Sequence, residues 1–130
     1  MNVVDSSAWL EFFADGPEAG EFAAVLSDRA SLLVPTITIY EVFKVVCRQR
    51  GEDAALQAAA LMQQGMAVEL SPSLAMVAAR TSLELALPMA DSIMLATARL
   101  HDATLWTLDE HLQGLPGVRY FPKRQASPST

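Results

Sequence analysis

The sequence predicts an α/β fold in which helices cover both faces of a short-stranded, mainly parallel central sheet. Short apolar runs alternate with helical patterns along the 130 residues, and this alternation is typical of parallel sheets that are buried on both faces. The composition is 52% hydrophobic and 18% charged, which supplies the apolar surface of one core and excludes a disordered chain. We therefore expect one three-layer α/β/α domain over residues 1–121 and a polar, disordered tail over residues 122–130.

In the first half of the chain, apolar runs are followed by helical spacing. Residues 2–4 are a short buried strand, and Ser6 and Ser7 after it are good caps for a helix. Pro17 suits the start of a helix, and Gly51 suits the end of one. The predicted elements are a strand at 2–4, a helix after it, a helix from Pro17 to about Arg29, a strand at 31–34 closed by Pro35, and helices at 38–50 and 52–64.

The second half continues the alternation. Pro72 and Pro88 each suit the start of a helix, and the second of these helices carries Ile93, Thr97 and Leu100 on one face. Glycines and a proline separate the last two apolar runs. The predicted elements are a strand at 66–70, helices at 72–87 and 89–101, a strand at 104–107 and a strand around 118–121.

Charge and cysteine content exclude several classes of protein. A single cysteine cannot form an internal disulfide, and with only two histidines a Cys/His-rich metal site is excluded. No apolar run approaches the roughly 18 residues of a membrane span, and the first residues lack the basic region of a signal peptide, so we expect a cytoplasmic protein without a membrane partner. The net charge of −6 disfavours binding of nucleic acid by charge alone, but it leaves a metal-dependent enzyme open.

Four acidic residues fall where a predicted strand ends or a predicted helix begins. They are Asp5, Glu41, Asp91 and Asp109. Because ligands bind beyond the carboxyl ends of parallel strands, we expect these carboxylates to converge on one edge of the sheet. Glu41 and Asp91 are predicted to lie in the first turns of their helices.

Each acid taken alone also has a purely structural explanation. The segments Thr38-Ile-Tyr-Glu41 and Thr107-Leu-Asp-Glu110 match capping boxes, and an acid such as Asp91 in a first turn is favoured by the helix dipole. Taken together, converging carboxylates repel one another unless a cation lies among them. All-oxygen sites of this kind suit Mg²⁺ or Mn²⁺, and such ions support the hydrolysis of phosphodiesters.

The residues around the four acids resemble those of a known family. The segments are VVDSSAWLEFF, TITIYEV, LPMADSIMLATAR and ATLWTLDEHL, in the family's order along residues 2–121. In these segments the chain resembles the PIN-domain ribonucleases, specifically the small VapC-type toxins of bacterial type II toxin–antitoxin pairs. The resemblance implies a PIN-like fold and a metal-dependent endoribonuclease that acts as a toxin.

The resemblance also implies site residues and partners. Asp5, Glu41, Asp91 and Asp109 would be the catalytic acids that hold Mg²⁺ or Mn²⁺. The family's hydroxyl groups near the site match Ser6 and Thr107 by position. The implied partners are an RNA substrate, a cognate antitoxin protein and a second copy of the chain in a homodimer.

Candidate contacts to RNA are few. Lys44 and Arg48 lie three and seven positions after Glu41, hence on roughly the same helix face, where they would reach phosphates beside the metal; the alternative is that they are ordinary solvated charges. His111 lies two positions after Asp109, at the rim of the expected site.

Other functions remain to be weighed against the nuclease. The non-enzymatic alternative is a catalytically silent PIN-like scaffold that binds RNA or a protein. Aspartate-based phosphatases and phosphoacceptor domains are disfavoured, because they need a lysine late in the fold and none lies between Lys44 and Lys123.

Overall fold

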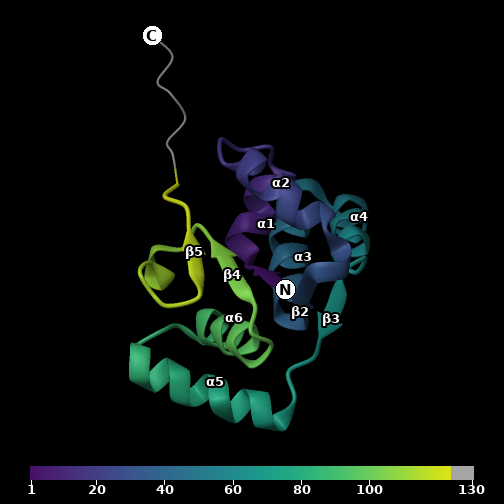
Figure 1. The fold of residues 1–130 in the computed structure, drawn as a ribbon. Coiled ribbons are helices and arrows are strands. Elements are labelled where there is room, and N and C mark those ends of the chain that lie inside the picture. Colours follow the sequence, from purple (N-terminus) through teal and green to yellow (C-terminus); the bar gives the residue numbers. More distant parts are fainter. Residues whose placement is uncertain (124–130) are drawn as a thin grey trace.

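The computed structural model describes residues 1–123 and confirms the α/β class (Figure 1). Five strands form one sheet in the order β3-β2-β1-β4-β5, and every pairing is parallel. The strands are β1 (Asn2–Val4), β2 (Leu32–Pro35), β3 (Met66–Val68), β4 (Thr104–Thr107) and β5 (Val118–Tyr120). The helices are α1 (Ser6–Phe13), α2 (Ala19–Ser27), α3 (Thr36–Arg50), α4 (Glu52–Met62), α5 (Pro72–Leu85) and α6 (Met89–Leu100), with short 3₁₀ turns η1 (Arg29–Ser31) and η2 (Glu110–Leu112).

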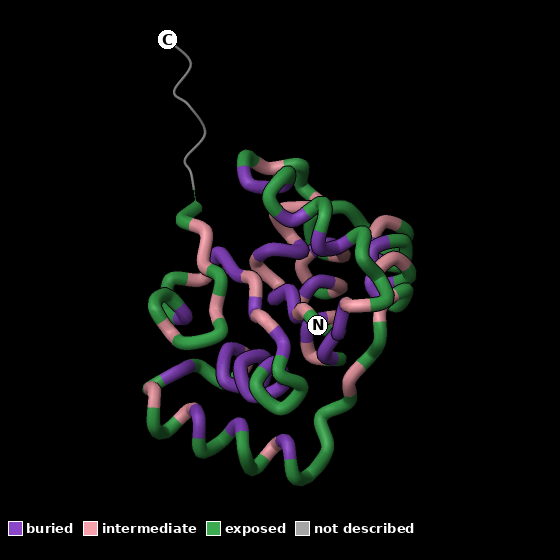
Figure 2. The backbone as a smooth tube through the Cα atoms, in the orientation of Figure 1, coloured by how far each residue is buried: buried purple, intermediate pink, exposed green. Residues whose placement is uncertain are grey.

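The helices divide between the two faces of the sheet because strand side chains alternate (Figures 1 and 2). On one face, Val4 and Val34 pack with buried residues of α1, α2, α3 and α4, among them Trp9 and Phe22. On the other face, Val3, Leu33 and Leu105 pack against α6, for example on Met94 and Leu95. Helix α5 lies outside α6 and packs on it through Leu74 and Ala78. The predicted three layers are therefore confirmed.

The strand order reverses between β1 and β4, which is the topological switch point of the sheet. Strands β2 and β3 lie on one side of β1 in the sheet, and β4 and β5 lie on the other side of β1. Val4 is in register with Trp106, and the backbone N–H of Asp5 donates to the carbonyl of Trp106 at 3.1 Å. The residues that follow β1 and β4 therefore lie side by side at the edge where ligands bind in such sheets.

Some element boundaries differ from the predicted ones. Helix α3 begins at Thr36, two residues earlier than predicted, directly after Pro35. Glu41 therefore lies in the second turn and not the first, and Thr38 is a buried helix-interior residue, so the Thr38–Glu41 capping box does not form. The cap of α1 is Asp5, not the predicted serines, since its carboxylate accepts from the backbone N–H of Ala8 at 3.1 Å.

Residues 124–130 of the predicted polar tail lie outside the described residues. Within residues 1–123, none of the helices is both long enough and apolar enough to cross a membrane.

Candidate active site

Asp5 is the most buried member of the acidic group, with 2% of its surface exposed. It follows β1, and its side chain accepts hydrogen bonds from the hydroxyl of Ser7 at 2.6 Å and from the hydroxyl of Thr107. Burial raises the pKa of Asp5 from 3.8 to about 6, an effect that these hydrogen bonds and that of Ala8 partly oppose. The fold thus maintains a nearly inaccessible carboxyl group at the end of the central strand.

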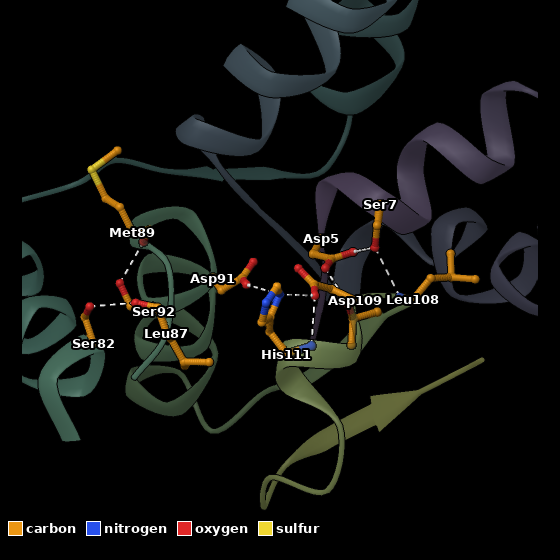
Figure 3. Close-up of polar contacts among 11 residues, drawn as sticks. Asp5, Ser7, Ser82, Leu87, Met89, Asp91, Ser92, Leu108, Asp109 and His111 are labelled. Atoms are coloured by element: carbon orange, nitrogen blue, oxygen red, sulfur yellow. Dashed lines mark hydrogen bonds and ion pairs between the residues drawn. The ribbon is translucent and has the colours of Figure 1, made fainter. Parts of the chain in front are cut away.

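Thr107 links the ends of β1 and β4. Its buried hydroxyl donates to Asp5 Oδ2 and accepts from the backbone N–H of Asp109 at 2.8 Å. Ser7 provides a second link between the same two segments, since its hydroxyl accepts from the backbone N–H of Leu108 at 3.1 Å. These two hydroxyl groups hold the segment that carries Asp109 against Asp5. Figure 3 shows the link from Ser7 to Leu108.

Asp91 approaches from the other side of the switch point. It lies in the first turn of α6, whose N-terminus faces the carboxyl ends of the strands, and only 8% of its surface is exposed. Its Oδ2 atom is buried without a hydrogen-bond partner among residues 1–123. Burial first, and then the neighbouring Asp109 and Asp5 carboxylates, raise the pKa of Asp91 from 3.8 to about 7; His111 opposes this rise.

His111 completes the group of side chains in Figure 3. Asp109 caps η2 through a bond from the backbone N–H of His111 to its Oδ1, and the imidazole Nδ1 lies 2.9 Å from the same oxygen. The Nδ1 atom is also 3.8 Å from Asp91 Oδ2. Ligand atoms of Asp91, Asp109 and His111 all lie within 4.8 Å of one another, so these residues can surround one ion.

Glu41 is attached to the site less directly. It is half-buried in the second turn of α3, which follows the neighbouring strand β2. Its Oε1 atom is buried and has no hydrogen-bond partner within the described part of the chain. None of the contacts recorded for residues 1–123 joins it to the other acids, so its place in the metal site stays a prediction.

The other predicted site residues differ in whether they contact the acids. Thr107 contacts Asp5 as described, whereas the serine hydroxyl on Asp5 belongs to Ser7 and not to Ser6. Lys44 and Arg48 are exposed on α3, where they line a shallow groove of about 630 Å³ with mainly apolar neighbours such as Phe43. No recorded contact in residues 1–123 brings either one to the acids, so their role toward RNA also stays a prediction.

Sequence reasoning did not assign three features near the acids. Ser7 and His111 contact the acids directly, as described above. In addition, a pocket of about 340 Å³ between α1 and α3 reaches Ser7 and Leu108 and is lined by the basic residues Arg50 and Lys123. The signal for His111 was its spacing of two from Asp109, which placed it at the rim without giving it a role.

The donor set fits a divalent cation. Buried polar atoms almost always have a partner, yet four side-chain atoms within residues 1–123 have none, and two of them, Asp91 Oδ2 and Glu41 Oε1, are carboxylate oxygens that can bind a cation. Two carboxylates and an imidazole lie within 4.8 Å of one another, a mixed oxygen and nitrogen set that divalent metal ions accept. Asp91 and Asp109 are therefore the residues best placed to hold an ion.

Replacing Thr107 by Val tests the hydroxyl link between the strand ends. Val has nearly the same shape, so the change removes only the bond to Asp5 and the acceptor for the Asp109 N–H. We expect Thr107→Val to lower the free energy of unfolding by about 1–3 kcal/mol, because buried polar groups lose their partner. Urea unfolding measures this loss, and Thr104→Val, at the half-buried start of β4, is the control; equal effects of the two changes would contradict the link.

Comparison with known proteins identifies the family and the fold. Residues 3–118 match the family model described as PIN domain, whereas no curated protein sequence matches the chain. A toxin–antitoxin complex from Klebsiella pneumoniae is 23% identical, with a TM-score of 0.77 over 92% of this chain and 96% of that chain. Mycobacterium tuberculosis VapC20, a sarcin-ricin loop cleaving toxin, is 18% identical, with a TM-score of 0.71 over 84% and 90%. DNA-bound VapBC from Salmonella typhimurium is 14% identical, with a TM-score of 0.69 over 92% and 96%.

At these identities the solved structures show a shared fold. The family model covers most of the chain and includes Asp5, Glu41, Asp91 and Asp109. With its parallel sheet, its acids at the switch point and this match, the chain belongs to the PIN domain family.

Proposed function

We propose that this protein is a metal-dependent endoribonuclease that acts as the toxin of a toxin–antitoxin module. The observation that carries the proposal is the group formed by Asp91, Asp109 and His111, with its buried, unpartnered Asp91 Oδ2 atom. Membership of the PIN domain family and the fold shared with VapC toxins support it. A cytoplasmic location, expected from the sequence, stays a prediction.

Mg²⁺ or Mn²⁺ would be held by Asp91 and Asp109, with Asp5 and Glu41 adding negative charge. When bound, the ion supplies a Lewis acid that activates water and neutralises the phosphate of the scissile phosphodiester. The protein side chains orient the site: Ser7 and Thr107 fix the Asp5 carboxylate through their hydroxyl groups. Asp109 is fixed from two sides: its backbone N–H donates to Thr107, and its side chain accepts from the backbone N–H of His111.

RNA and an antitoxin are the proposed partners, and a homodimer is the proposed assembly. Similar folds occur in a toxin–antitoxin complex and in DNA-bound VapBC. The pocket between α1 and α3 opens beside Ser7 and Leu108 and carries Arg50 and Lys123. Because the chain as a whole is acidic, these basic residues are proposed contacts to RNA phosphates, alongside the earlier prediction for Lys44 and Arg48.

Cleavage of RNA by antitoxin-free protein tests the proposal. We expect cuts at discrete positions in total RNA, a tRNA pool or a sarcin-ricin loop RNA with Mn²⁺ or Mg²⁺, and none with EDTA, because the acids alone provide no Lewis acid. Gel electrophoresis of end-labelled RNA measures the cuts. Folded, metal-loaded protein that binds these RNAs without cutting any of them would contradict the proposal and favour the catalytically silent scaffold.

A further inference from the structure

His111 lies in the acidic group in the geometry of a metal ligand. Its backbone is held by the Asp109 cap of η2, and the next residue, Leu112, is fully buried in the core. The imidazole Nδ1 is thereby held 2.9 Å from Asp109 Oδ1 and 3.8 Å from Asp91 Oδ2 (Figure 3). The cap thus holds the backbone of His111 at the site, and the imidazole, with 59% of its side chain exposed, lies at the rim of the acidic group.

The distances suit a shared ion. Ligand atoms at about 2.1 Å from an octahedral ion are about 3.0 Å apart at a right angle and about 4.2 Å apart on opposite sides. The 2.9 Å distance from Nδ1 to Asp109 Oδ1 is close to the right-angle value, and the 3.8 Å distance to Asp91 Oδ2 lies between the two values. Asp91 Oδ2, the buried atom without a partner among residues 1–123, is one of the two oxygens.

We infer that His111 is a direct nitrogen ligand of the divalent ion and makes this site prefer Mn²⁺ over Mg²⁺. The inference rests on the proposed function, since it deepens the chemistry of the same site. Neutral imidazole offers one nitrogen lone pair. Mg²⁺ prefers oxygen ligands and keeps its waters, whereas a site with nitrogen donors favours transition metals. An acidic quartet alone would not distinguish the two ions in this way.

Electron spin echo measurements on bound Mn²⁺ test for the ligand directly. Mn²⁺ is added to tag-free, EDTA-treated protein, and the nitrogen modulation of a coordinated imidazole is recorded. We expect it in the wild type and not in His111→Asn, which carries no imidazole. The matched control is His101→Asn: His101 is the only other histidine, and it ends α6 with Nδ1 2.9 Å from the carbonyl oxygen of Thr97. This control should retain the modulation.

Metal affinity gives a second readout. We expect His111→Asn to weaken Mn²⁺ binding about 10-fold, as loss of a coordinating or orienting group does, while Mg²⁺ binding, measured by competition with Mn²⁺, changes less than about twofold. Bound Mn²⁺ without nitrogen modulation in the wild type, or modulation that persists in His111→Asn, would overturn the ligand assignment. Equal losses for both ions would overturn the preference.

The same samples separate this inference from the proposed function. Wild type that cuts RNA but shows no nitrogen modulation would overturn the ligand assignment and leave the nuclease intact. Wild type that shows the modulation but cuts no RNA would overturn the nuclease proposal and leave the ligand assignment intact. Protein that binds no Mn²⁺ would overturn both.

Discussion

Asp91→Asn is expected to abolish metal-dependent RNA cleavage while making the metal-free protein more stable at pH 8. Activity should fall by more than about 100-fold, since even loss of an outer partner of a metal ligand costs roughly 10- to 100-fold. Stability should rise because Asp91 is buried, has no hydrogen-bond partner on Oδ2 among residues 1–123, and is repelled by Asp109 and Asp5. We expect a gain on the order of 2 kcal/mol.

Two comparisons make this result specific. The gain should shrink toward pH 4, because burial and the neighbouring acids raise the Asp91 pKa to about 7 and the wild-type carboxyl group is then already neutral in the folded protein. Asp53→Asn, which changes an exposed acid in the first turn of α4, should alter neither activity nor stability appreciably. Full activity in Asp91→Asn would remove this residue from the site.

The metal-free wild type is expected to lose stability as the pH rises from about 4 to above 7. The pKa of Asp5 is raised from 3.8 to about 6 and that of Asp91 to about 7, mainly through burial. Between pH 3.8 and about pH 7 the folded protein binds more protons than the unfolded chain. The free energy of unfolding therefore decreases as the pH rises. The stabilising contribution is full below pH 3.8 and lost above pH 7; for Asp5 alone it amounts to about 3 kcal/mol.

Urea unfolding at a series of pH values measures this effect, and added Mn²⁺ provides the complementary test. At pH 8 the ion neutralises the charged acids, and at 100 times its dissociation constant it should add about 2.7 kcal/mol. At pH 5 the same concentration should add much less, because protons compete for the carboxylates. Stability that stays flat or rises between pH 5 and pH 8 without metal would contradict the burial of ionised acids at the switch point.

The fold followed closely from patterns in the sequence. The short strand β1 was recognisable from Val3 and Val4, because a strand buried on both faces places apolar residues next to one another. Each helix then began near the residue that its proline or cap indicated. The start of α3 was the exception, since Pro35 ends β2 and leads directly into the helix at Thr36. That shift moved Glu41 into the second turn.

The sequence by itself also determined that acids follow β1 and β4 and begin α6, because a parallel sheet places those positions on one edge. Only the tertiary structure decided which neighbouring side chains join them. Of two adjacent serines, Ser7 reaches Asp5, because the Asp5 cap sets the rotation of α1. His111 lies beside Asp109 and Asp91 because η2 is capped by Asp109 and anchored by Leu112. Such contacts depend on how elements distant in the sequence pack, which local patterns do not encode.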